Sequence, residues 1–155
     1  DGFDTHGAQV DKSASDGPHA PLLQQLGDAM ACFHAAMAAI GMSDAVTQFT
    51  QSDFGRTFKP NNSLGTDHGW GNHQWVMGGA VRGQRTYGTY PTLVLGGPDD
   101  VGVEAWEQHG RWIPTTSVDQ YAATLLSWFG ADPGVLDTVL PNLRNFGNRT
   151  TLGFV

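Results

Sequence analysis

The chain has 155 residues, of which 39% are apolar and only 15% are charged, and its formal net charge is −7. An acidic chain lacks the basic face that nucleic acid binding requires, and no run reaches the roughly 18 apolar residues of a membrane span. The length and the apolar content instead predict a single domain, residues 1–155, and its 21 glycines indicate many loops and tight turns.

The first long element that the sequence predicts is a helix. Residues 2–7 fit the end of a strand that runs into a loop, and the prolines at 18 and 21 suit a first helical turn. Apolar side chains then recur at three- and four-residue spacings, at Leu22, Leu26, Met30, Phe33, Met37 and Ile40. We expect a helix over 22–40 whose apolar face is buried against a sheet.

The middle of the chain predicts short strands joined by polar loops. Residues 46–51 are rich in β-branched and aromatic side chains, and 74–77 form a second apolar run that ends in glycines. Residues 52–57 form the turn that leaves the first of these strands, and 59–71 form a loop. One or two further short strands are expected over 86–95.

The last third predicts two helices and a tail without regular structure. Ser117 and Gln120 have the spacing of a capping box, which predicts the start of a helix that Gly130 ends. A short third helix is expected over 132–140, followed by a loop-like tail over 142–155.

A strand, a long helix and a second strand in succession form the βαβ pattern of a parallel α/β sheet. Ligands of such sheets gather where strands end at their carboxyl side. Asp4, His6 and Asp53 each follow a predicted strand, so we expect them at the same edge of the sheet.

Two clusters contain residues that could bind a metal ion. Asp4 and His6 are two apart, so on an extended segment they point to the same side and could share one cation. A hydrogen-bonded Asp/His pair in a turn is an equal alternative. The second cluster, over 65–73, holds Asp67, His68 and His73 among three glycines, and imidazole with carboxylate suits zinc, manganese or iron. An ordinary glycine-rich surface loop is the alternative reading here.

Asp53 and Arg56 form a third candidate, in the turn after the strand over 46–51. A carboxylate directly after a buried strand is held rigidly, as a metal ligand or a general base must be. Arg56 could bind an anionic substrate through its planar guanidinium, or it could simply close the turn as an ion pair with Asp53.

Several stretches together resemble a bacterial family catalogued as domain of unknown function 1501. The stretches are FDTH at 3–6, SDFGRT at 52–57, GTDHGWG at 65–71 and IPTTSVDQY at 113–121, and residues 141–154 resemble the end of that family. Members are longer and often carry a twin-arginine export signal. The resemblance therefore implies the C-terminal third of an exported protein, periplasmic or secreted.

The family in turn resembles alkaline phosphatases, sulfatases and cofactor-independent phosphoglycerate mutases. This implies an α/β three-layer sandwich of the alkaline phosphatase kind, incomplete in this chain. It also implies a divalent metal, zinc first, with manganese, calcium or magnesium as alternatives. Asp4, His6 and His68 would bind a first metal and Asp53 a second. Phe54 stands where the superfamily has the second-metal histidine, so either Asp67 or His73 compensates or the second metal site is lost.

The leading functional prediction is a metal-dependent hydrolase of phosphate or sulfate esters, or the C-terminal portion of one, acting on a small-molecule or glycan ester. Asp53 and Arg56 would be its catalytic residues, and its nucleophile would lie in the N-terminal portion that this chain lacks. The alternative is an exported protein that binds metal or glycan without catalysis. The density of Asp and His residues favours the enzyme, and Phe54 favours the binding protein.

Overall fold

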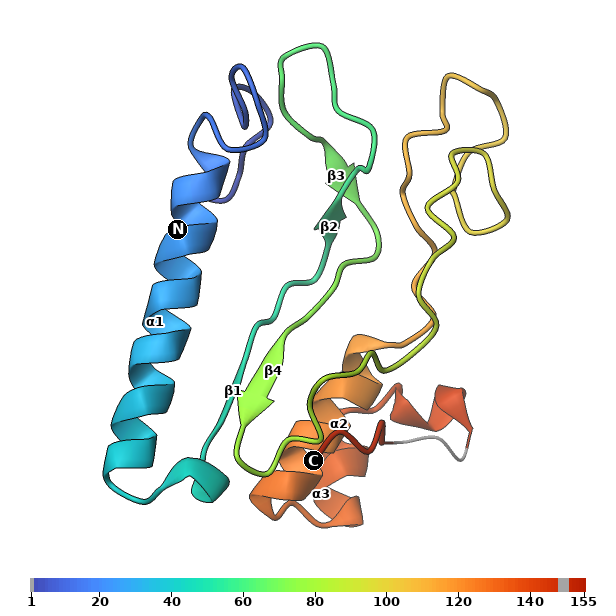
Figure 1. The fold of residues 1–155 in the computed structure, drawn as a ribbon. Coiled ribbons are helices and arrows are strands. Elements are labelled where there is room, and N and C mark those ends of the chain that lie inside the picture. The colour runs from blue at the N-terminus through green and yellow to red at the C-terminus, as the bar shows by residue number, and fades with distance from the viewer. Residues whose placement is uncertain (1, 148–150) are drawn as a thin grey trace. The chain divides into compact units, whose positions relative to one another are not determined.

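A computed structural model describes residues 2–147 and 151–155 (Figure 1). The chain divides into two compact units. The first comprises residues 1–79 and 91–113, and the second comprises residues 80–90 and 114–155. The secondary structure is mixed α/β, as expected, with helices and small antiparallel sheets. None of the helices among the described residues is long and apolar enough to cross a membrane.

In the first unit, residues 47–56 and residues 68–78 run in opposite directions and form two pairs of strands (Figure 1). We call these two stretches the outgoing arm and the returning arm. The outgoing arm holds β1 (Thr47–Phe49) and β2 (Gly55–Arg56), and the returning arm holds β3 (His68–Gly69) and β4 (Val76–Gly78). β1 pairs with β4 and β2 pairs with β3, both antiparallel. The pair that matters for the site is Arg56 opposite His68.

The predicted βαβ arrangement with a parallel sheet does not form among the described residues, because residues 2–7 are not a strand and both sheets are antiparallel. The N-terminal segment, residues 2–9, instead bonds to the loop between β2 and β3. The Ala8 amide donates to the Ser63 carbonyl at 2.8 Å, and the Gln9 amide donates to the Leu64 carbonyl at 2.9 Å. A chain that reverses through a loop returns antiparallel, whereas a parallel partner needs a crossover.

The long helix is present as α1 (His19–Ala39), followed by the 3₁₀ turn η1 (Ser43–Ala45), but the expectation of a buried apolar face is wrong. No residue of α1 is buried, Met30 is only partly covered, and Phe33 is 44% exposed. Gln48 of β1 is bonded to this helix, because its Nε2 donates to the Met30 carbonyl at 3.3 Å.

The strands expected over 86–95 are absent; this stretch has no regular secondary structure. Asp99 holds the turn that replaces them, because it accepts bonds from the amide and the hydroxyl of Thr92, both at 2.6 Å. The Thr92 hydroxyl, followed by its amide, lowers the pKa of the Asp99 carboxyl. Leu93 has a φ of 58°, a left-handed conformation that interrupts an extended strand.

The second unit contains the predicted helices, α2 (Val118–Phe129) and α3 (Pro133–Val139), and a 3₁₀ turn, η2 (Leu143–Phe146), within the tail expected to be irregular. The predicted capping box is confirmed: the Gln120 amide donates to Ser117 Oγ, and the Ser117 amide donates to Gln120 Oε1, each at 3.0 Å. Gly130 ends α2 with a φ of 106°.

The core of the second unit is small and joins α2, α3 and η2 through Ala123, Leu136 and Leu143. The end of the chain packs on the same helix. The Phe154 ring lies 5.7 Å from that of Tyr121, and the Leu152 amide donates to Thr124 Oγ1 at 2.8 Å. Burial of Tyr121, which is 8% exposed, raises the pKa of its phenol to about 12.

This raised pKa predicts a stability loss at alkaline pH. Its ordinary value is 10.0, so between pH 10.0 and about 12 the folded state keeps the Tyr121 proton that the unfolded state releases. The contribution of Tyr121 to the free energy of unfolding should be constant below pH 10.0. It should fall by about 1–3 kcal/mol as the pH rises to about 12. Urea unfolding followed across this range measures the fall.

Tyr121→Phe should remove that part of the pH dependence, whereas Tyr90→Phe, at a residue 55% exposed, should leave it in place. The same alkaline slope in the wild-type protein and in Tyr121→Phe would contradict the prediction.

Candidate metal centre

The site begins with the contact between the N-terminal segment and the loop that precedes β3. The Thr66 amide donates to the Thr5 carbonyl at 3.2 Å, and Asn61 Nδ2 donates to the His6 carbonyl at 2.8 Å. Gly65 is buried at this contact, where a Cβ atom would lie 2.6 Å from the Thr5 carbonyl oxygen and would also collide with the His6 carbonyl group. The absence of a side chain at Gly65 therefore lets the two segments meet.

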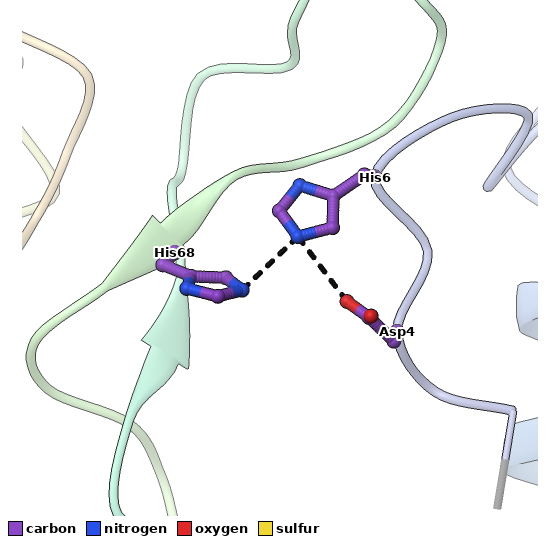
Figure 2. Close-up of side chains that lie close together, drawn as sticks. All are labelled: Asp4, His6 and His68. Carbon is purple, nitrogen blue, oxygen red and sulfur yellow. Dashed lines mark hydrogen bonds and ion pairs between the residues drawn. The ribbon is translucent and has the colours of Figure 1, made fainter.

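Three side chains converge where these segments meet. Figure 2 shows Asp4 and His6 from the N-terminal segment facing His68 from β3. His6 Nε2 lies 3.2 Å from Asp4 Oδ1 and 3.0 Å from His68 Nε2, and all three ligand atoms lie within 4.8 Å of one another. All three residues are exposed, so an ion in solution could reach them.

The donor set fits a divalent cation. Three protein ligands with a further position open to solvent is the arrangement of catalytic zinc sites, and bonds of about 2.0–2.2 Å place tetrahedral ligand atoms about 3.3–3.6 Å apart. The two shorter separations, 3.0 and 3.2 Å, are near this range, and the group spans no more than 4.8 Å. Small movements of the side chains would suffice to surround one ion.

Arg56 binds the carboxylate of this group. Its Nη2 lies 2.5 Å from Asp4 Oδ1, and its Nη1 donates to the Thr66 carbonyl at 3.0 Å. The hydrogen bond from Arg56 is the main cause that lowers the pKa of Asp4. The ion pair considered for Arg56 and Asp53 therefore forms with Asp4 instead, among the residues that the structure describes.

Asp67 contacts His6 from the other side of the ring. Its Oδ1 lies 3.4 Å from His6 Nδ1, the nitrogen that does not face Asp4 or His68, and it accepts a 2.9 Å bond from Asn61 Nδ2. The Asn61 bond, followed by that of His6, lowers the pKa of Asp67. Asp67 is therefore an ionised neighbour of the group and not one of the three side chains whose ligand atoms cluster.

Phe54 packs on the imidazole ring of His68. The ring centroids of Phe54 and His68 lie 4.4 Å apart, and the guanidinium carbon of Arg56 lies 6.0 Å from the centre of the Phe54 ring. Phe54 therefore limits the positions open to the His68 ring.

Of the residues predicted from sequence, Asp4, His6 and His68 are brought together, and Arg56 and Asp67 touch them. Asp53 and His73 are described by the structure but do not belong to the group of clustered ligand atoms. Sequence reasoning missed the role of Asn61 at the site: the sequence indicates a turn and an Asn-x-Ser glycosylation pattern there. Neither pattern points to its partners His6 and Asp67, because these depend on how the loop closes.

Comparison with known proteins gives one family. Residues 1–134 match the model of a family described as Protein of unknown function (DUF1501), and this range contains every residue of the site. Neither a curated protein nor a solved structure matches the chain.

The close approach at Gly65 predicts the effect of adding a methyl group there. Gly65→Ala should displace the segment that carries Asp4 and His6 and should lower the free energy of unfolding by about 1–3 kcal/mol, the usual cost of overpacking. Urea unfolding measures the loss, and nuclear Overhauser contacts between the His6 and His68 rings measure the displacement.

Gly27→Ala is the matched control, because no atom lies within 4 Å of the added carbon in α1. It should preserve the ring contacts and stabilise the helix by up to about 1 kcal/mol. Unchanged stability and intact ring contacts in Gly65→Ala would show that the approach is less tight than described.

Proposed function

The chain belongs to the DUF1501 family of proteins of unknown function, and we propose that it is a metal-dependent hydrolase of phosphate or sulfate esters, or the C-terminal portion of one. The observation that carries the proposal is the convergence of Asp4, His6 and His68, whose ligand atoms lie within 4.8 Å of one another although His68 is 62 residues from His6. Residues this far apart in sequence do not meet through local turn formation.

The chemistry of the donors supports zinc as the metal. Two imidazoles together with one carboxylate suit zinc, and also manganese, whereas calcium and magnesium prefer oxygen ligands alone. A divalent cation held there would supply positive charge that stabilises the negative charge developing on a phosphoryl or sulfuryl group.

The residues around the group have separate roles in this proposal. Asp4, His6 and His68 hold the cation. Arg56 lowers the pKa of Asp4 through its hydrogen bond and brings a second positive charge to the same place, where it can attract an anionic ester. Asp53 is exposed directly before Phe54 and is proposed as a general base outside the ligand group. Phe54 provides an apolar wall against His68.

We also propose that the chain forms the C-terminal third of an exported, alkaline-phosphatase-like α/β sandwich. The uncovered apolar surface of α1 supports this, because a helix that is apolar on most sides is usually buried by further structure. In that arrangement the nucleophile comes from the remainder of the fold, and the substrate is a small-molecule or glycan ester.

One observation favours a second candidate, a protein that binds metal or glycan without catalysis. The Phe54 ring lies 4.4 Å from the His68 ring, in the place where the resemblance implies a histidine for a second metal. A single metal beside an apolar ring is a poorer match to two-metal hydrolysis.

Zinc binding tests the part that both candidates share. His68→Ala should weaken zinc binding at least about 10-fold, because it removes one of three ligands. Binding should also weaken in acid, since protons compete with the metal for the imidazoles. Calorimetric titration with zinc at two pH values measures both effects.

His34→Ala is the matched control, because His34 is exposed on α1 and outside the ligand group. It should bind zinc as the wild-type protein does. Equal zinc affinity in wild type and His68→Ala would remove the metal centre and both candidate functions with it.

Turnover separates the two candidates. With zinc, the 155-residue chain should hydrolyse aryl phosphates and aryl sulfates slowly, and a longer natural protein that contains it should do so much faster. In the longer protein, His68→Ala should lower kcat/KM by about 100-fold or more, since the loss of a ligand exceeds that of an outer-shell partner. Chromogenic esters measure both rates.

If the longer protein binds zinc through His68 but turns over neither ester, the non-catalytic candidate is favoured. Rapid turnover by the 155-residue chain, abolished by changing a serine or threonine within it, would contradict the placement of the nucleophile.

A further inference from the structure

The two nitrogens of the His6 ring face different partners. Nε2 is hydrogen-bonded to His68 Nε2 at 3.0 Å, and Nδ1 is hydrogen-bonded to Asp67 Oδ1 at 3.4 Å. Asp4 Oδ1 lies 3.2 Å from Nε2, within ion-pair distance but without a hydrogen bond to it. A neutral imidazole carries a proton on one nitrogen and a lone pair on the other. Only the nitrogen with the lone pair can bind a cation, so the tautomer of His6 decides whether the group is ready for a metal.

We propose that Asp67 is a positioning residue that keeps the proton of His6 on Nδ1, so that Nε2 presents its lone pair to the cation. Asp67 is then not a ligand but the outer partner of one, an arrangement that fixes the ring and raises the basicity of metal-binding histidines. The inference rests on the metal centre of the proposed function, and it assigns to Asp67 a role different from the ligand role that the sequence predicts.

The alternation of the backbone explains how neighbours reach opposite sides of one ring. Asp67 directly precedes His68, which begins β3, and successive side chains of an extended segment point in opposite directions. His68 therefore approaches Nε2 of His6 while Asp67 approaches Nδ1. A residue at position 67 cannot easily join His68 on the same side without disturbing the strand.

The Asp67 backbone is held on both sides by Thr57. The Thr57 amide donates to the Asp67 carbonyl at 2.9 Å, and the Asp67 amide donates to Thr57 Oγ1 at 3.1 Å. Thr57 is only 3% exposed, so this attachment is shielded from water. Asp67 is therefore anchored where its carboxylate can reach Nδ1 but is kept from moving towards the cluster.

Asn61 completes the support. Its Nδ2 group donates to both Asp67 Oδ1, at 2.9 Å, and the His6 carbonyl, at 2.8 Å, and its Oδ1 accepts from the Gly65 amide at 3.1 Å. One side chain thus fixes the carboxylate relative to the residue whose ring it orients. Asp67 Oδ1 thus accepts from Asn61 Nδ2 and also contacts His6 Nδ1, at 3.4 Å.

The arrangement also determines the tautomer of the second histidine in the metal-free protein. If His6 Nε2 carries a lone pair, the 3.0 Å contact between the two Nε2 atoms requires His68 to donate from its own Nε2. The metal-free protein should therefore contain two different tautomers, with the proton on Nδ1 in His6 and on Nε2 in His68.

Long-range proton–nitrogen NMR spectra of the metal-free 155-residue protein, at a pH where the rings are neutral, read these tautomers directly. Wild type should show the His6 proton on Nδ1, and Asp67→Ala should move a large share of it to Nε2. Asp67→Asn should restore part of the wild-type pattern, because an amide oxygen can still accept from Nδ1. Zinc titration of the same proteins should show a 10–100-fold loss of affinity in Asp67→Ala and a smaller loss in Asp67→Asn.

Asp28→Ala is the control, since this carboxylate is exposed on α1 and bonds only Gln24 among the described contacts. It should change neither readout. A wild-type His6 with its proton on Nε2 would overturn the inference whatever the variants do, and so would lower zinc affinity in Asp67→Ala with an unchanged His6 tautomer, which would make Asp67 a ligand. If wild type binds no zinc, the proposed function fails, while the metal-free tautomers still decide the role of Asp67.

Discussion

The site depends on one close approach of backbone to backbone, between the N-terminal segment and the loop before β3. Gly65 permits it, because any side chain there would collide with the carbonyl groups of Thr5 and His6. Asn61 then secures it by donating to the His6 carbonyl. Without this contact, Asp4 and His6 would remain in a polar segment far from His68 in sequence, and no group of ligand atoms would exist.

The Asp4 carboxylate lies next to two basic side chains of the site. The guanidinium of Arg56 donates to its Oδ1 atom, and His6 Nε2 lies 3.2 Å from the same atom. The hydrogen bond from Arg56 lowers the pKa of this carboxyl. A metal ion would join the same oxygen, so Arg56 both prepares the ligand and shares it, which makes the strength of that ion pair a determinant of metal affinity.

The first unit has few buried apolar residues and leaves many large apolar side chains exposed to solvent. α1 buries none of its residues, and large side chains such as Phe33 and Ile40 are 44% and 66% exposed. The second unit, by contrast, has a core in which Ala123 is fully buried and Leu143 is 3% exposed. The second unit therefore buries apolar residues in a core of its own, whereas the apolar face of α1 in the first unit is left uncovered.

The sequence by itself determined the elements whose signals are local. The spacing from Leu22 to Ile40 predicted α1, and Ser117 with Gln120 predicted the start of α2, because these patterns act between residues three or four apart. Only the tertiary structure decided that the strands pair antiparallel, that Asp67 and His68 approach opposite nitrogens of His6, and that Asp53 lies outside the ligand group. The contacts of His6 join residues that are 61 and 62 positions apart in the sequence, and they depend on the space that the missing side chain at Gly65 leaves. Neither condition leaves a local pattern in the sequence.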